Sequence, residues 1–157
     1  MARYAVGTAT AGSAQNMTTT FKTLIGITAL TGATTLRKCW IYDMMFGADG
    51  SPGDTVITYQ ADRQSTAGTG TAATPSLQET TDAASLMTVA VNHTAEPTAV
   101  SNSVLVGVPI NQRASHRWVA SPGGELVVPA TTANGIGLRA KSPTYASTCA
   151  ATVWWWE

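Results

Sequence analysis

Hydrophobic and polar side chains alternate along two segments of the chain, as they do in β-strands that bury one face. The longer segment is Leu36–Phe46, and strict alternation there places Trp40 and Tyr42 on the same face as Phe46. The second segment is Asp54–Asp62, and a cluster of glycine and proline separates the two. Both segments are therefore predicted to be strands joined by a sharp turn.

Shorter runs that are rich in β-branched residues, with glycine and proline between many of them, predict further strands. These strands are Arg3–Thr10, Phe21–Leu30, Val104–Val108, Ser115–Val119, Leu126–Val128, Ile136–Lys141 and Cys149–Trp156. Ser65–Pro75 is predicted to be a loop, and Leu77–Asn92 fits either a short helix or extended chain. Close spacing of strands in the C-terminal half predicts an all-β fold, a single-domain antiparallel β-sandwich or jelly roll.

The first twenty residues differ from the rest because they are mostly small and polar. Such residues cannot build a core of their own, but they suit a strand that adds to the edge of another subunit. We therefore divide the chain into an extended N-terminal arm, residues 1–20, and a jelly-roll domain, residues 21–157. For Arg3–Thr10 a first strand inside the chain's own sandwich is an equal alternative.

The charge composition argues against some classes of function, above all binding to nucleic acid or to membranes. The 157 residues include nine Lys and Arg and nine Asp and Glu, so the formal net charge is zero, and only 11% of residues are charged. Binding to nucleic acid or to an anionic membrane surface needs a cationic surplus, so neither partner is expected. No stretch approaches the eighteen apolar residues of a membrane span. A surface near zero net charge favours association with other proteins.

Candidate chemistry is sparse. Cys39 and Cys149 have no partner at metal-ligand spacing, and they form either one disulfide or two buried thiols. If the last strand lies beside the strand with Cys39, the two thiols are expected to be close. His93 and His116 are isolated from any acidic or cysteine partner at ligand spacing, and the glycine-rich run 68–73 lacks a following helix to bind a phosphate. We expect no catalytic residue, no metal, no cofactor and no enzymatic activity.

Aromatic residues and arginines instead suggest an interface. Arg113, Arg117 and Trp118 lie close together, and the chain ends in Trp154-Trp155-Trp156-Glu157. Arginine with tryptophan is typical of interface hot spots, although a cation–π pair inside one subunit is an alternative. In a strand Trp154 and Trp156 share one face, which needs a partner if Trp155 faces the core. The predicted subunit interface consists of Trp40, Tyr42, Arg113, Arg117, Trp118, Trp154 and Trp156.

Several segments together resemble small structural proteins of tailed bacteriophages, over nearly the whole chain. These segments are Met1–Gly7, Ala67–Gly70, Thr94–Thr98, Asn111–Ser115, Arg117-Trp118, Pro122–Glu125, Pro129 and Asn134–Arg139. The chain is similar to the head decoration, or cement, proteins that stud phage capsids.

The resemblance implies a single jelly-roll domain, often in trimers at capsid three-fold positions, without catalysis. We therefore expect a virion protein, assembled in the bacterial cytoplasm, that forms homotrimers on the capsid surface and bridges subunits of the major capsid protein. The expected capsid contacts lie in the arm, at Arg3, Tyr4, Val6, Thr8 and Thr10. The main alternative is a carbohydrate- or receptor-binding jelly-roll module of a phage head or tail fibre.

Overall fold

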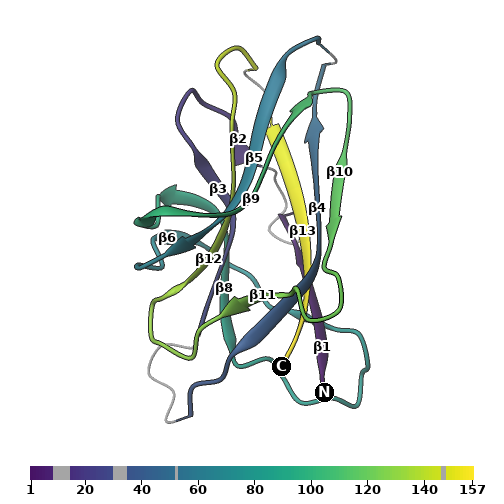
Figure 1. Ribbon diagram of the computed structural model, residues 1–157, viewed down its shortest axis with the longest axis vertical. Coiled ribbons are helices and arrows are strands. Elements are labelled where there is room, and N and C mark those ends of the chain that lie inside the picture. Colours follow the sequence, from purple (N-terminus) through teal and green to yellow (C-terminus); the bar gives the residue numbers. More distant parts are fainter. Residues whose placement is uncertain (9–14, 30–34, 52, 146–147) are drawn as a thin grey trace.

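The protein is a β-sandwich (Figure 1). A computed structural model describes residues 1–8, 15–29, 35–51, 53–145 and 148–157. Within these ranges the chain forms two antiparallel sheets that pack against each other, and it contains no α-helix. The predicted all-β class and sandwich architecture are confirmed.

The two sheets, here called sheet A and sheet B, are built from strands far apart in the sequence. Sheet A has the strand order β10 (His116–Val119), β4 (Cys39–Asp49), β13 (Thr148–Trp156), β1 (Arg3–Gly7), β7 (Ser76–Leu77), with β11 (Leu126–Val128) beside β4 and β2 (Gln15–Asn16) beside β13. Sheet B has the order β6 (Thr69–Ala72), β8 (Met87–Ala95), β3 (Lys22–Ala29), β12 (Gly135–Lys141), β5 (Val56–Gln64), β9 (Ala99–Asn111).

Successive strands often change sheets, as β3, β4 and β5 do, and such connections are those of Greek-key and jelly-roll sandwiches. The core lies between the sheets because inward-facing positions of both are apolar. Its largest fully buried side chains include Trp155 and Phe46 from sheet A, and Tyr59 and Leu138 from sheet B. Phe46 and Tyr59 join the sheets directly, with ring centroids 5.1 Å apart.

Strand β1 lies inside the sandwich rather than in an arm. It pairs with β13 on one side, from Arg3 opposite Trp156 to Gly7 opposite Thr152, and with β7 on the other. The side chains of Tyr4 and Val6 are buried in the core. The alternative of a first strand in the chain's own sandwich therefore holds for Arg3–Gly7, because pairing with β13 buries alternate residues that an arm would expose.

Strand β13 is interior to sheet A, between β1 and β4, as predicted for the last strand. The expectation that the two thiols are close is wrong. Cys39 lies opposite Val128 at one end of β4, whereas Cys149 lies opposite Ala48 at the other. At about 3.3 Å per residue this separates them by roughly 30 Å. Both are buried free thiols.

A β-bulge breaks the alternation predicted for β4. Trp154 lies opposite Asp43 while Trp155 lies opposite Ile41, so Tyr42 is an extra residue on β4. Trp40 and Tyr42 consequently face away from the core, whereas Phe46 faces into it. One segment differs from expectation, because β6 forms within the predicted loop. Of the two alternatives for Leu77–Asn92, extended chain holds from Met87 onward, where strand β8 begins.

Candidate functional site

The outer face of sheet A carries most of the aromatic residues predicted to form an interface. Along β13 the side chains alternate, so that Trp155 is fully buried while Trp154 and Trp156 lie half-buried on the other face. Trp40 lies opposite Trp156 in register on β4. We call Trp40, Trp154 and Trp156, together with Tyr42, the aromatic ridge. No described strand packs over it.

Two contacts hold side chains of the ridge in place. The indoles of Trp40 and Trp156 stack with ring centroids 4.3 Å apart and planes 11° from parallel. The hydroxyl of Tyr42 accepts a hydrogen bond of 3.0 Å from Nε2 of Gln78. A hollow of about 240 Å³ lies between Arg3, Tyr42 and Trp156. A fixed, partly exposed aromatic surface loses little side-chain entropy when a partner covers it.

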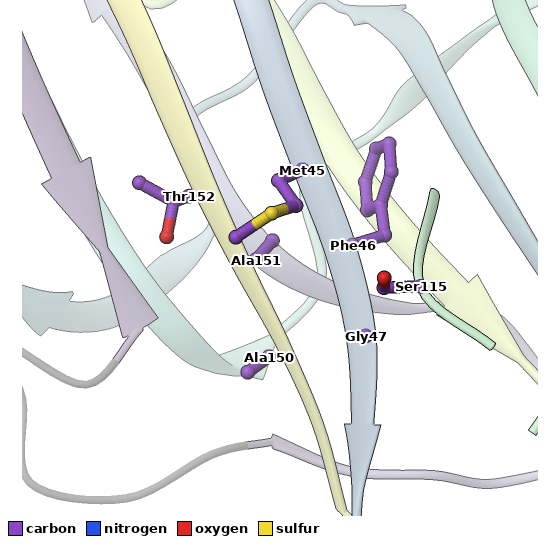
Figure 2. A pocket seen from close by; sticks show the side chains of 7 residues that line it. All are labelled: Met45, Phe46, Gly47, Ser115, Ala150, Ala151 and Thr152. Carbon is purple, nitrogen blue, oxygen red and sulfur yellow. The ribbon is translucent and has the colours of Figure 1, made fainter. Parts of the chain in front are cut away.

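The opposite end of the same strands is lined by small residues. Figure 2 shows a hollow in which the side chain of Met45 reaches from β4 toward Thr152 on β13, while Phe46 points to the other side of β4. Its volume is about 140 Å³, and Gly47 and Ala150 form part of its wall. We call it the small-residue hollow. The outer face of sheet A therefore has aromatic side chains at one end and, apart from Met45, mainly small ones at the other.

One ion pair crosses this face. Nε of Arg117 on β10 lies 3.0 and 3.1 Å from the two carboxylate oxygens of Asp43 on β4. Asp43 is 7% exposed and Arg117 63% exposed at the side chain. The hydrogen bonds that Arg117 donates to Asp43, together with the negative charge of Asp43, raise the pKa of Arg117 above its usual value.

Exposed apolar side chains lie on the same face. Met45 is 42% exposed and Val119 58% exposed. The outer face of sheet B differs in character, because it carries the ion pairs Lys22–Glu96 and Arg139–Asp62. Sheet B also exposes apolar side chains, the valines Val56, Val100 and Val104, so what distinguishes sheet A is its cluster of aromatic residues.

Not every predicted interface residue lies on this face. Trp118 faces the other side of β10 from Arg117 and packs against the core, because strand alternation separates neighbours in sequence. Arg113 lies in the turn after β9 and pairs with Asp54, 3.3 Å away. The sequence did not single out Met45 and Val119. For Met45 the reason is the bulge in β4, which changes the side that later residues of the strand face.

The residues predicted to contact the capsid differ in how far their side chains are exposed. The side chains of Tyr4, Val6 and Thr8 are buried within the chain's own fold, and their contact with a capsid stays a prediction. Arg3 is exposed at the edge of the aromatic ridge, and Thr10 lies outside the described residues.

The structure offers no site for metal chemistry in its described ranges, where no three His, Cys, Asp or Glu side chains lie close enough to hold an ion. No helix there is long and apolar enough to cross a membrane. Part of the glycine-rich run 68–73 forms β6, which pairs with β8. Comparisons of the chain with protein-family models, curated proteins and solved structures found no match.

Proposed function

We propose that this chain is a non-enzymatic structural protein of a phage virion that decorates and stabilises the capsid by bridging shell subunits. The observation that carries the proposal is the uncovered, apolar and aromatic outer face of sheet A. An apolar face of this kind favours contact with another protein. The resemblance of the chain's sequence segments to capsid decoration proteins suggests that its partners are capsid proteins.

We further propose that the face joins copies of the chain into a homotrimer. The aromatic ridge and the small-residue hollow lie at opposite ends of β4 and β13, so the ridge of one copy can pack against the hollow of the next. A contact between unlike parts of the surface is heterologous and closes into a ring when the rotation permits. The exposed residues outside this contact would then face the shell.

The benefit to a capsid is mechanical. An interface of standard size buries about 800 Å² on each partner. Burial of apolar surface contributes about 25 cal/mol per Å², less the cost of association, and the contact repeats wherever a trimer binds the shell. Many copies acting across neighbouring shell subunits oppose their separation more strongly than one copy does.

Electron cryo-microscopy of virions whose genome encodes this chain tests the proposal. We expect density for the sandwich on the outer surface of the shell, at joints between major capsid subunits. Density only at the tip of a tail or fibre, or particles that lack the chain altogether, would contradict decoration.

A second candidate is a carbohydrate-binding module of a head or tail fibre. The hollow between Arg3, Tyr42 and Trp156 favours it, because indoles stack on sugar rings while guanidinium and hydroxyl groups hydrogen-bond sugar hydroxyls. A glycan array probed with wild type and with Trp156→Ala decides between the two. Binding that the substitution abolishes supports the lectin function, and no binding to any glycan counts against it.

A further inference from the structure

Two chain connections cross over the outer face of sheet B and hold each other in place. Residues 65–68 connect β5 to β6, and residues 96–98 connect β8 to β9. The amide of Ser65 donates to the carbonyl of Thr98 at 2.9 Å, and the amide of Thr98 donates to Oγ1 of Thr66 at 2.8 Å. Gly68 has a φ of +65°, and a Cβ there would stand 2.6 Å from the carbonyl oxygen of Ala95. The connections therefore cross in direct contact.

His93 is enclosed beneath this crossing. It is a fully buried residue near the end of β8. A Cβ on Gly26 of β3 would lie 3.1 Å from Cε1 and Nε2 of the imidazole, and a Cβ on Gly70 of β6 would lie 3.1 Å from Nδ1. The ring is thus held between a central strand of sheet B and the edge strand β6, at positions where only glycine leaves room for it.

The hydrogen bonding of His93 fits the neutral imidazole. Nε2 lies 3.3 Å from the carbonyl oxygen of Ala67, so this nitrogen carries the proton. Nδ1 is buried and has no hydrogen-bond partner within the described residues, and neither does the side-chain amide of nearby Gln64. A proton added at Nδ1 would face the backbone of Gly70 rather than water. Burial of the ring lowers the pKa of His93.

The charged groups around His93 are already engaged with each other. Glu96 favours the charged imidazole and Lys22 opposes it, but the two form a 2.8 Å ion pair, and Glu96 also accepts hydrogen bonds from Thr23. The carbonyls of Ala67 and Thr23 favour the charged form as well, yet desolvation outweighs these contributions. Asp62, which is paired with Arg139, lies near Gln64, since both side chains approach Gly137. The guanidinium of Arg63, the neighbour of Gln64 on β5, donates to the carbonyl of Val127. Strand β6 has no titratable residue.

We propose that His93 is an acid-sensitive latch that holds β6 and the β5–β6 connection against sheet B while it is neutral and releases them when it is protonated. The weak point is β6, because this four-residue edge strand pairs only with β8 and its register shifts between Thr69 and Thr71. Movement of β6 would admit water to Nδ1 and hydrate the imidazolium at small cost. The latch is independent of the function proposed for sheet A.

The direction of the pH dependence follows from which of the two forms, closed or open, binds the proton more tightly. In the closed form the pKa of His93 is lowered, whereas in an open, hydrated form it returns toward the ordinary value of 6.5. Protons therefore bind the open form more tightly, and the closed form is fully favoured above pH 6.5 and loses stability as the pH falls below it. Each unit by which the pKa is lowered raises the open population on the order of tenfold once both forms are protonated.

Hydrogen exchange of the β6 amides tests the latch. Protection factors are measured at pH 7 and pH 5 for wild type, His93→Gln and His116→Gln, with the β4 amides as internal reference. Glutamine can donate to Ala67 but cannot be protonated, and His116 is the only other histidine of the chain. We expect β6 protection to fall on the order of tenfold in wild type and His116→Gln, and to stay constant in His93→Gln. Equal protection of β6 at both pH values in wild type, or the same fall in His93→Gln, would overturn the proposal.

A second measurement covers the case in which His93→Gln does not fold. NMR titration of the His93 Cε1 proton in wild type reports the pKa of the folded state directly. A pKa below 6.5, with β6 resonances that change together with the imidazole, is the expected result. A pKa at or above 6.5, or an imidazole that titrates while β6 resonances stay unchanged, would refute the latch.

Discussion

Trp155 and Trp156 are adjacent in sequence, yet their substitution should destabilise the fold to very different extents. Trp155 is fully buried, its ring lies 5.8 Å from that of Tyr4 at an interplanar angle of 27°, and its Nε1 donates to Glu157 at 3.1 Å. Trp155→Ala removes the largest buried side chain of the core and should lower the free energy of unfolding by about 3–5 kcal/mol. Since small domains have only about 5–15 kcal/mol in total, this is a third or more of the stability of many domains.

Trp156→Ala is the matched control, because the side chain is half-buried on the outer face of sheet A. Within one subunit it loses mainly the stack on Trp40, which corresponds to about 0.5–1.5 kcal/mol. Urea denaturation, followed by fluorescence at concentrations low enough to keep both variants monomeric, gives the two values. If Trp155→Ala cost no more than Trp156→Ala under these conditions, the assignment of the two faces of β13 would be wrong.

Three further outcomes are expected. Gly135→Ala should prevent folding, because the new Cβ would stand 2.0 Å from the carbonyl oxygen of Ile27. Gly107→Ala, where the nearest atom is 3.4 Å from the new Cβ, should change the thermal midpoint little. Thermal unfolding followed by circular dichroism compares the two variants, and equal midpoints would contradict this prediction. Arg117→Ala should lower the midpoint more than Arg113→Ala, since only the former leaves a buried carboxylate unpaired; the reverse order would contradict that account. Both cysteines should resist thiol labelling until the protein is unfolded, and rapid labelling of the native state would contradict their burial.

The sequence predicted the strands well because apolar alternation is a local signal. Residues 126–128 and the strands that contain Trp40, Tyr59 and Trp155 were placed within a few residues of their observed bounds. The interior position of β13 could also be predicted, since the indoles of the chain's end need cover. These properties depend on residues a few positions apart.

The side of the sheet that a residue faces, and the residues that it contacts, were harder to predict because both depend on residues far apart in the sequence. The bulge at Tyr42 lies in the register between β4 and β13, so alternation alone placed Phe46 on the same face as Trp40, although the two face opposite sides. Arg117 and Trp118 were grouped by proximity in sequence, although adjacent residues of a strand face opposite ways. The enclosure of His93 requires two glycines on other strands, so the sequence around His93 does not predict it.

The molecular mass of the protein in solution tests the central claim, that the outer face of sheet A joins copies of this chain. Light scattering at micromolar concentration should give three times the 16.3 kDa of one chain for wild type. Trp156→Ala should weaken association by about 2 kcal/mol, roughly thirtyfold in the dissociation constant. Val104→Ala, at an exposed valine of sheet B, should behave as wild type. A wild-type monomer, or a trimer that Trp156→Ala leaves unchanged, would contradict the account.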